Sequence, residues 1–232
     1  MHKTGYWCNA HPYVGRVKGW GHRLQEAGHP ILSIGKWHYR NGADPTGFDT
    51  QIVPMHVVDG VGDVMGTVRD ALPERPRTKA LSEKIGPGET SYTKYDRQIT
   101  DTAVNWLFKE APELDQPWVI FVSLVWPHFP LIAPRKFFDL YDPNRISPPR
   151  DRPENGIPRH PWIEAQAGCQ SYDRFFTEET RRITIASYYG LCSFLGDYIG
   201  KILAALDLAG LAEPTSVIYT SDHGDNLGVR GL

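Results

Sequence analysis

Cysteine is scarce in this sequence, and long apolar runs are missing from it. The 232 residues include three cysteines, Cys8, Cys169 and Cys192. Their odd number and wide separation argue against a disulfide framework and against a zinc knuckle. The longest apolar stretch, WVIFVSLVW at 118–126, is far shorter than the ~20 residues that a bilayer-spanning helix needs. The first residues, MHKTGYWCNAHPYVGR, contain no apolar segment typical of a secretory signal peptide.

An excess of charge of either sign is also absent. Lys and Arg total 25 and Asp and Glu total 27, so the net charge of −2 creates no positive field that would attract nucleic acid. Residues 1–40 differ from this average, because they hold six basic residues, a single acid (Glu26) and five of the nine histidines. Such a segment suits a small anionic substrate better than a polyanion. Composition alone favours the alternative, a solvated basic surface.

Three short apolar runs predict buried strands: PILSI at 30–34, PWVIFVSLVW at 117–126 and SVIYT at 216–220. They are continuous and rich in β-branched residues, which is typical of strands that are covered on both faces in a parallel sheet. The stretches 41–95 and 142–176 show no clear periodicity and are expected to be long connections.

Helical patterns alternate with these runs over residues 19–29, 96–113 and 177–210. The first pattern ends at Gly28, and the last has Thr177 as its expected N-cap. Alternating helices and buried strands predict one α/β layered domain.

Each predicted strand runs directly into a cluster that contains a histidine: GKWH at 35–38, PHFP at 127–130 and SDHGD at 221–225. In open α/β sheets, ligands bind at the carboxyl ends of the strands. Three such clusters at three strand ends therefore predict an active site.

The first two clusters suit an anionic substrate. Lys36 and His38 point to the same side of an extended chain, with Trp37 on the other side, and so make an anion-binding pair with one titratable member. The alternative is an ordinary polar strand end. His128, held between two prolines, is suited to act as a general acid or as a hydrogen-bond donor to the substrate. The alternative is that it caps strand-end carbonyl groups.

The third cluster, SDHGD, supplies metal-binding groups. Asp222 offers a carboxylate oxygen and His223 an imidazole nitrogen, and both are ligands for divalent ions. Gly224 allows a sharp turn, and Asp225 is expected to orient that turn by accepting backbone N–H bonds. Two ligands do not close a coordination shell, and the alternative is an Asx-turn before a helix.

Together these residues resemble the sulfatase family of the alkaline-phosphatase superfamily. WGHRLQEAGHPILSIGKWHYR (20–40) is similar to the helix–strand–GKWH segment of that family. VWPHFPLIAPRKFFDLY (125–141) resembles its PHxP loop, and YTSDHGDNLG (219–228) its distal metal-binding loop. GFDTQIVPMHVVDGVGD (47–63) resembles the branch that holds bacterial choline-sulfatases and arylsulfatase-like enzymes.

The resemblance implies an alkaline-phosphatase-like α/β/α sandwich with a mostly parallel sheet, and a role for each residue. Lys36 would contact the sulfate oxygens, and His38 would hydrogen-bond the nucleophile and help to break down a sulfo-enzyme intermediate. His128 would bind the sulfate or protonate the leaving oxygen. Asp222 and His223 would hold one divalent metal, commonly calcium, with magnesium and manganese as alternatives.

The nucleophile of this family is formylglycine, which is made from cysteine in a C-x-P-S-R or C-x-A-S-R motif. No such motif occurs in the 232 residues: Cys8 opens CNAHP, Cys169 opens CQSYD and Cys192 opens CSFLG. The family's paired N-terminal aspartate ligands are not found either. Residues 1–232 are therefore expected to be an internal part of a sulfatase catalytic domain, incomplete at both ends and inactive when isolated.

The expected reaction is metal-assisted hydrolysis of a small anionic sulfate ester through a covalent intermediate. One alternative is a phosphonate or phosphate ester hydrolase of the same superfamily, because those esters share tetrahedral geometry and in-line displacement with sulfate esters. Another is a non-catalytic truncated remnant. Neither nucleic acid nor a membrane span is expected, and the resemblance implies a homo-oligomer, since the family is often multimeric.

Overall fold

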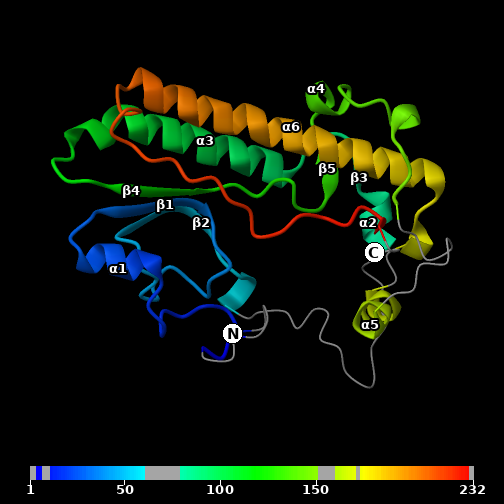
Figure 1. Cartoon of the computed structure of the whole chain (residues 1–232), viewed down its shortest axis with the longest axis horizontal. Helices are drawn as coiled ribbons and strands as arrows, with labels where there is room; N and C mark the ends of the chain where they lie inside the picture. The colour runs from blue at the N-terminus through cyan, green and yellow to red at the C-terminus, as the bar shows by residue number, and fades with distance from the viewer. Residues whose placement is uncertain (1–3, 7–10, 61–78, 151–159, 171–172, 230–232) are drawn as a thin grey trace. The chain divides into compact units, whose positions relative to one another are not determined.

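The computed structural model describes residues 4–6, 11–60, 79–150, 160–170 and 173–229 (Figure 1). Cys8 lies outside these residues. The chain divides into two compact units. Unit 1 comprises Met1–Met65, Lys94–Val125 and Tyr198–Ser216, and unit 2 comprises Gly66–Thr93, Trp126–Asp197 and Val217–Leu232.

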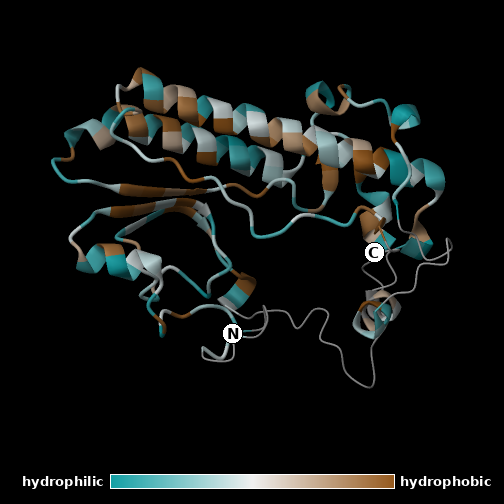
Figure 2. Cartoon of the chain, in the orientation of Figure 1, coloured by the Kyte–Doolittle hydropathy of each residue, from teal (hydrophilic) through white to brown (hydrophobic). Residues whose placement is uncertain are grey.

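Unit 1 is built on a three-stranded parallel sheet in the order β2–β1–β4. The strands are β1 (Ile31–Lys36), β2 (Thr50–Met55) and β4 (Val119–Ser123). Figure 2 shows hydrophobic residues along β1 and β4, the two strands that overlap the apolar runs at 30–34 and 117–126. Both of those strand predictions are confirmed, and β1 is buried along five of its six residues, as expected for the central strand.

Strand β2 falls in the stretch expected to be a connection, and the sequence does not predict it. Thr50 and Gln51 are polar, Pro54 has no N–H to donate, and none of the six residues is fully buried. This composition is tolerated because β2 lies at the end of the strand order, where one edge of the strand needs no partner. Its position is fixed at the start by Asp49, whose Oδ2 accepts from Ile31 N at 2.7 Å.

The three predicted helices are present as α1 (Trp20–Glu26), α3 (Ser91–Lys109) and α6 (Glu178–Leu208). In unit 1, α3 buries Ile99, Ala103 and Leu107 in one cluster with Leu32 and Ile34 of β1. These α3 positions are spaced at helical intervals in the sequence, so the apolar face of the helix covers the sheet. None of the helices in the described ranges has the length and apolarity needed to cross a bilayer.

The ends of these helices follow the signals in the sequence. Thr180 N donates to Thr177 Oγ1 at 3.1 Å, and Thr177 N donates to Thr180 Oγ1 at 2.8 Å, so Thr177 caps α6 as predicted. Gly28 follows α1 with φ +87° and Gly210 follows α6 with φ +72°. Glycine ends helices in this left-handed conformation at low cost because it has no Cβ.

Unit 2 contains a parallel pair formed by β3 (Ile85–Pro87) and β5 (Leu131–Ala133). Helix α6 packs on this pair: Gly86 N donates to Ser187 Oγ at 3.0 Å, and a Cβ on Gly190 would lie 3.0 Å from the Cβ of Ala133. The other described helices are α2 (Lys79–Glu83), α4 (Arg135–Phe138) and α5 (Pro161–Gln170), with 3-10 turns at Val58–Gly60, Ala111–Glu113, Pro143–Arg145 and Asp173–Phe175.

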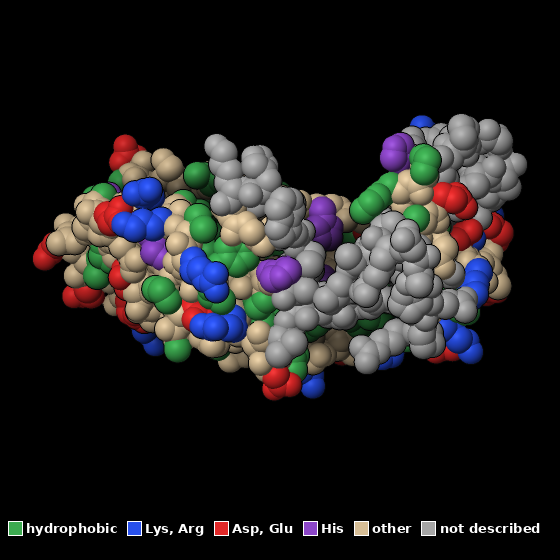
Figure 3. Space-filling model, turned by 90° about the horizontal axis from the view of Figure 1, so that it is seen from below, with side chains coloured by type: hydrophobic (Ala, Val, Ile, Leu, Met, Phe, Trp, Pro, Cys, Tyr) green, Lys and Arg blue, Asp and Glu red, His purple; other side chains and the backbone are tan. Residues whose placement is uncertain are grey.

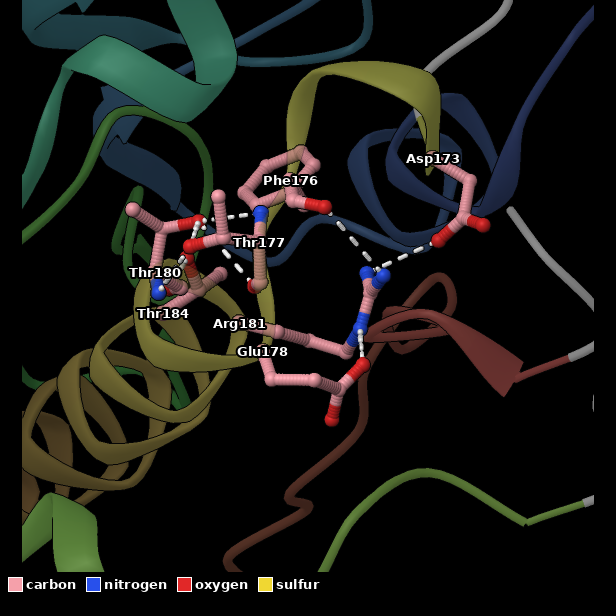
Figure 4. A network of polar contacts seen from close by, with 7 residues as sticks. All are labelled: Asp173, Phe176, Thr177, Glu178, Thr180, Arg181 and Thr184. Carbon is pink, nitrogen blue, oxygen red and sulfur yellow. Dashed lines mark hydrogen bonds and ion pairs between the residues drawn. The ribbon is translucent and has the colours of Figure 1, made fainter.

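A buried arginine joins the start of α6 to the preceding turn in unit 2 (Figure 4). Arg181 Nη1 lies 2.8 Å from Asp173 Oδ1, and its Nε lies 3.5 Å from Glu178 Oε1. The Arg181 side chain is 7% exposed, so its charge needs these partners. The network therefore holds the Asp173–Phe175 turn against the first turns of α6.

The predicted strand at 216–220 is wrong. These residues form no strand, and the side chains of Val217, Ile218 and Tyr219 are 58%, 88% and 69% exposed. The apolar residues of this run favour burial, but a strand also needs a neighbouring backbone with which it can form hydrogen bonds. Among the described strands, none pairs with this segment.

Gly35 is a position where we expect little tolerance to a side chain. It has φ +107°, and a Cβ there would lie 2.2 Å from the carbonyl oxygen of Ser123. Because backbone cannot move aside easily, Gly35→Ala should destabilise the chain by more than about 3 kcal/mol. Gly200→Ala is the control: Gly200 lies in α6 with no atom within 4 Å of the added methyl, and should gain about 0.5–1 kcal/mol.

The free energies of unfolding of both variants in urea would test this contrast. Equal unfolding midpoints for Gly35→Ala and Gly200→Ala would contradict the close backbone approach at the end of β1.

Candidate active site

The GKWH segment leaves the carboxyl end of β1 in unit 1. Trp37 stacks on Tyr39 with ring centroids 4.7 Å apart, and lies 4.5 Å from the rings of both Phe48 and Phe121. The aromatic cluster therefore anchors Trp37. This packing of Trp37 is what the sequence predicts, and the placement of Lys36 and His38 on the opposite side stays a prediction.

The charge of Lys36 acts on His38. Partial burial lowers the pKa of the His38 imidazole, and the positive charge of Lys36 lowers it further. At neutral pH the pair therefore consists of a cation and a neutral ring that can accept or donate a proton. The structure brings these two predicted residues together in unit 1.

Three other cations of residues 1–40 form ion pairs with carboxylates. Lys18 and Arg23 both pair with Glu26, and Arg40 pairs with Asp44. In the view from below in Figure 3, the Lys and Arg side chains of the described residues lie in separate groups and form no continuous basic patch. For these three residues the solvated basic surface, the simpler reading of the composition, is the better description.

His128 lies in unit 2, in a loop where Trp126–Pro127 and Phe129–Pro130 are both cis peptide bonds. Its Nδ1 is 2.7 Å from the carbonyl oxygen of Phe129. A carbonyl can only accept, so Nδ1 carries the proton and the neutral ring has its lone pair on Nε2. The ring also meets Tyr92 edge-on, with centroids 6.0 Å apart. The loop thus fixes both the tautomer and the orientation of His128.

Asp222 and His223 form a second pair in unit 2. Asp222 Oδ1 accepts from His223 N at 2.9 Å, and Asp222 Oδ2 lies 3.6 Å from His223 Nε2. His223 Nδ1 donates to the carbonyl oxygen of Gly224 at 2.8 Å, which leaves the Nε2 lone pair on the side of Asp222. Asp225 Oδ1 accepts from Leu227 N at 2.9 Å and so orients the turn, as expected.

This pair has the donor types of a metal site but is not a complete one. The two side chains are 86% and 77% exposed, and the described residues contain no group of three or more His, Cys, Asp or Glu placed to hold a metal ion. A carboxylate oxygen and an imidazole nitrogen suit a divalent cation, but two donors leave its shell open. The expectation that the partners come from elsewhere therefore stands as a prediction.

His56 is a candidate that the sequence analysis misses. It follows β2 directly, and Met55 pairs in register with Lys36. Trp37 N donates to Met55 O at 2.8 Å, and Val57 N donates to Tyr39 O at 3.0 Å. His56 thus lies beside the GKWH segment at the same sheet edge. A histidine that directly follows a predicted strand could have indicated this candidate. The strand itself was not predicted, because Thr50, Gln51 and Pro54 interrupt its apolar character.

The electrostatic coupling of Lys36 and His38 can be measured directly. Lys36→Met removes the positive neighbour, so the pKa of His38 should rise toward its ordinary value while partial burial keeps it below. Histidine ring resonances followed against pH by NMR would report the change. Lys18→Met, at a lysine paired with Glu26, should leave the pKa of His38 unchanged, and an unaltered pKa in Lys36→Met would contradict the coupling.

The sequence of this chain is similar to those of known sulfatases. A model of the sulfatase family matches residues 21–231. The chain is 28% identical to a choline-sulfatase of Rhizobium meliloti (strain 1021) over 247 aligned positions, covering 99% of this chain and 46% of that protein. It is 32% identical to human arylsulfatase K over 235 positions, covering 97% of this chain and 42% of the relative. The chain thus spans about half the length of the curated relatives it matches.

Solved structures show a similar fold. The phosphonate monoester hydrolase of Agrobacterium radiobacter superposes with a TM-score of 0.70 at 19% identity, over 100% of this chain and 52% of that one. At this identity the likeness shows the fold alone, and it confirms the predicted alkaline-phosphatase-like α/β class. Because the family model covers nearly the whole sequence and includes GKWH, PHFP and SDHGD, the chain belongs to the sulfatase family.

Proposed function

We propose that this chain is the part of a sulfatase that binds the sulfate group and helps to transfer it from an ester to water. The observation that carries the proposal is Lys36 beside His38 at the carboxyl end of β1, within the 21–231 match to the sulfatase family. The substrate would be a small anionic sulfate ester. The chain spans less than half of its curated relatives, so the activity of a whole protein is also part of the proposal.

Lys36 would bind the sulfate oxygens. Its ammonium group neutralises the negative charge of the sulfate and the charge that grows on the leaving oxygen as the S–O bond breaks. Partial burial of Lys36 strengthens the attraction, because fewer waters screen it. His38 would hydrogen-bond the hydroxyl of the nucleophile. Since partial burial and the charge of Lys36 keep its ring neutral, His38 could accept a proton from that hydroxyl.

His128 would act at the leaving oxygen. Its Nδ1 proton is committed to Phe129 O, so any proton it transfers belongs to Nε2. A ring fixed in this way either donates a hydrogen bond to the sulfate or, when protonated, gives its Nε2 proton to the departing alkoxide.

Sulfatases generally use a metal ion together with formylglycine. We propose Asp222 Oδ2 and His223 Nε2 as two ligands of that ion, and calcium as its identity, with magnesium and manganese as alternatives. The ion would supply positive charge for the sulfate and for the nucleophile. The hydrogen bond from His223 Nδ1 to Gly224 O supports this assignment, because it orients Nε2 for a ligand.

Phosphonate or phosphate ester hydrolysis is the second candidate. The similarity in fold to a phosphonate monoester hydrolase is the observation that suggests it. A phosphonate monoester also has the same tetrahedral shape and single negative charge as a sulfate ester. Lys36 and His38 would bind either anion, so the two reactions differ in which anion is preferred.

Anion binding by the purified chain tests the site. Sulfate, phenyl sulfate and phenylphosphonate would be titrated by calorimetry in calcium buffer against the wild type and Lys36→Met. The control is Lys109→Met, at an exposed lysine at the end of α3. Lys36→Met should weaken sulfate binding about tenfold, because one charge-assisted contact of roughly 1.4 kcal/mol is lost. Lys109→Met should bind as the wild type does.

Three outcomes separate the candidates. Stronger binding of phenylphosphonate than of phenyl sulfate would favour the second candidate, and equal affinities in wild type and Lys36→Met would reject the site. Because the 232 residues contain no C-x-P-S-R or C-x-A-S-R motif, the chain should bind 4-nitrophenyl sulfate without releasing 4-nitrophenol. Metal-dependent release would show that a different nucleophile operates.

A further inference from the structure

Strand β2 contains a bulge at Val53 and Pro54. The register of its pairing with β1 shifts there, so these two residues of β2 stand opposite a single residue of β1, Gly35. A bulge changes the direction of the side chains that follow it, and bulges are common next to active sites. Lys36, the anion-binding residue of the proposed site, is the first residue of β1 that pairs with β2 after this irregularity.

Val53 adopts a backbone conformation that is unfavourable for valine. Its φ is +44°, which lies in the left-handed region where a β-branched side chain is strained. Val53 also precedes Pro54, and a residue before proline favours an extended backbone. Such a conformation costs free energy and persists only where other contacts hold it.

A contact from α3 holds this conformation. Tyr95 Oη donates to the carbonyl oxygen of Val53 at 2.5 Å. Burial, together with the neighbouring carboxylate of Asp96, raises the pKa of Tyr95 to about 12, so the hydroxyl keeps its proton at neutral pH and can donate it. Because the bond ends on the carbonyl of the strained residue, it opposes the return of Val53 to an extended strand.

The same turn of α3 contacts the carboxyl ends of the three strands of the sheet in unit 1. Beside Tyr95, Asp96 Oδ1 accepts from Val125 N at 2.8 Å, two residues beyond β4. One turn later, Ile99 packs on Gly35 of β1, where its Cδ1 would lie 2.8 Å from an added Cβ. Tyr95 contacts β2 in the same way that these two residues contact β4 and β1. This part of α3 therefore fixes the sheet edge at which the proposed site lies.

The bulge connects Tyr95 to the GKWH segment. After the bulge, Met55 O accepts from Trp37 N at 2.8 Å, and this bond holds the backbone between Lys36 and His38. If the bulge were lost, Met55 would move by one position relative to β1, and its carbonyl oxygen would no longer meet Trp37 N.

We propose that Tyr95 is a positioning residue of the anion site, and that its hydrogen bond to the β2 bulge determines where Lys36 and His38 lie. Tyr95 acts through the backbone of β2 and of Trp37, without contact to the sulfate. The inference rests on the proposed function, because it takes Lys36 and His38 as the residues that meet the sulfate.

Tyr95→Phe tests the proposal, because it removes the donating hydroxyl and keeps the ring. Inorganic sulfate would be titrated into the purified chain by calorimetry in calcium buffer, and its affinity should fall about threefold. The pKa of His38, followed by NMR, should rise toward its ordinary value, because Lys36 is no longer held beside it.

Tyr198→Phe is the matched control. The hydroxyl of Tyr198 accepts from Arg97 Nε at 3.1 Å, so this variant also removes a hydrogen-bonded tyrosine hydroxyl in unit 1, but the bond that it breaks joins α6 to α3. The affinity for sulfate and the pKa of His38 should both stay as in the wild type.

Hydrogen exchange separates positioning from general stability. The Trp37 amide is bonded to Met55 O beside the bulge, whereas the Val119 amide is bonded to Pro30 O, at 2.9 Å, at the other end of the sheet. In Tyr95→Phe the exchange rate of the Trp37 amide should rise about tenfold relative to that of the Val119 amide. A hydroxyl that contributes only to general stability would change both rates equally, which would contradict the proposal.

A second variant tests the role of the strained residue. Glycine adopts positive φ at little cost, so Val53→Gly should let the bulge persist without the hydrogen bond from Tyr95. Tyr95→Phe should therefore lower the affinity for sulfate less in the Val53→Gly background than in the wild type. An equal loss in both backgrounds would overturn the action of Tyr95 through the bulge.

The two proposals fail in different ways. If sulfate binding depends on Lys36 but is unchanged in Tyr95→Phe, the inference is wrong and the proposed function stands. If sulfate binding does not depend on Lys36, the proposed function fails. The pKa of His38 in Tyr95→Phe then decides whether Tyr95 positions Lys36, and an unchanged value would reject the inference as well.

Discussion

The close approach of β1 and β4 at Gly35 is the constraint on which the rest of unit 1 depends. With φ +107° and the Ser123 carbonyl where a Cβ would stand, the backbone turns out of the sheet without losing its pairing to β4. The chain then places Trp37 in the aromatic cluster. Lys36 and His38 are held at the sheet edge as a consequence, so their positions rest on backbone geometry and ring packing rather than on a flexible surface loop.

In both units, the surroundings of the histidines determine the tautomer or the protonation state of the ring. A backbone carbonyl fixes the tautomer of His128 and of His223, and in both cases the lone pair of the neutral ring falls on Nε2. Partial burial and the charge of Lys36 keep His38 neutral, and burial does the same for His56. The nitrogen that carries the proton is therefore defined in His128 and in His223.

The sequence by itself determined the elements whose burial is continuous. The apolar runs of β1 and β4, the helical spacing of Ile99, Ala103 and Leu107, and the caps of α6 are local signals, and the structure realises them. The motifs GKWH, PHFP and SDHGD likewise identified the family before any geometry was known.

Only the tertiary structure decided the rest, because pairing and burial depend on what lies beside a segment. Strand β2 forms from a polar run because β1 offers it an edge, while the more apolar 216–220 has no described partner and stays exposed. His56 carries no motif, and its two unsatisfied nitrogens exist only once the fold has closed around it. The sequence indicates which residues favour burial or hydrogen bonding. Only the fold determines which neighbours are present to bury them or to form those hydrogen bonds.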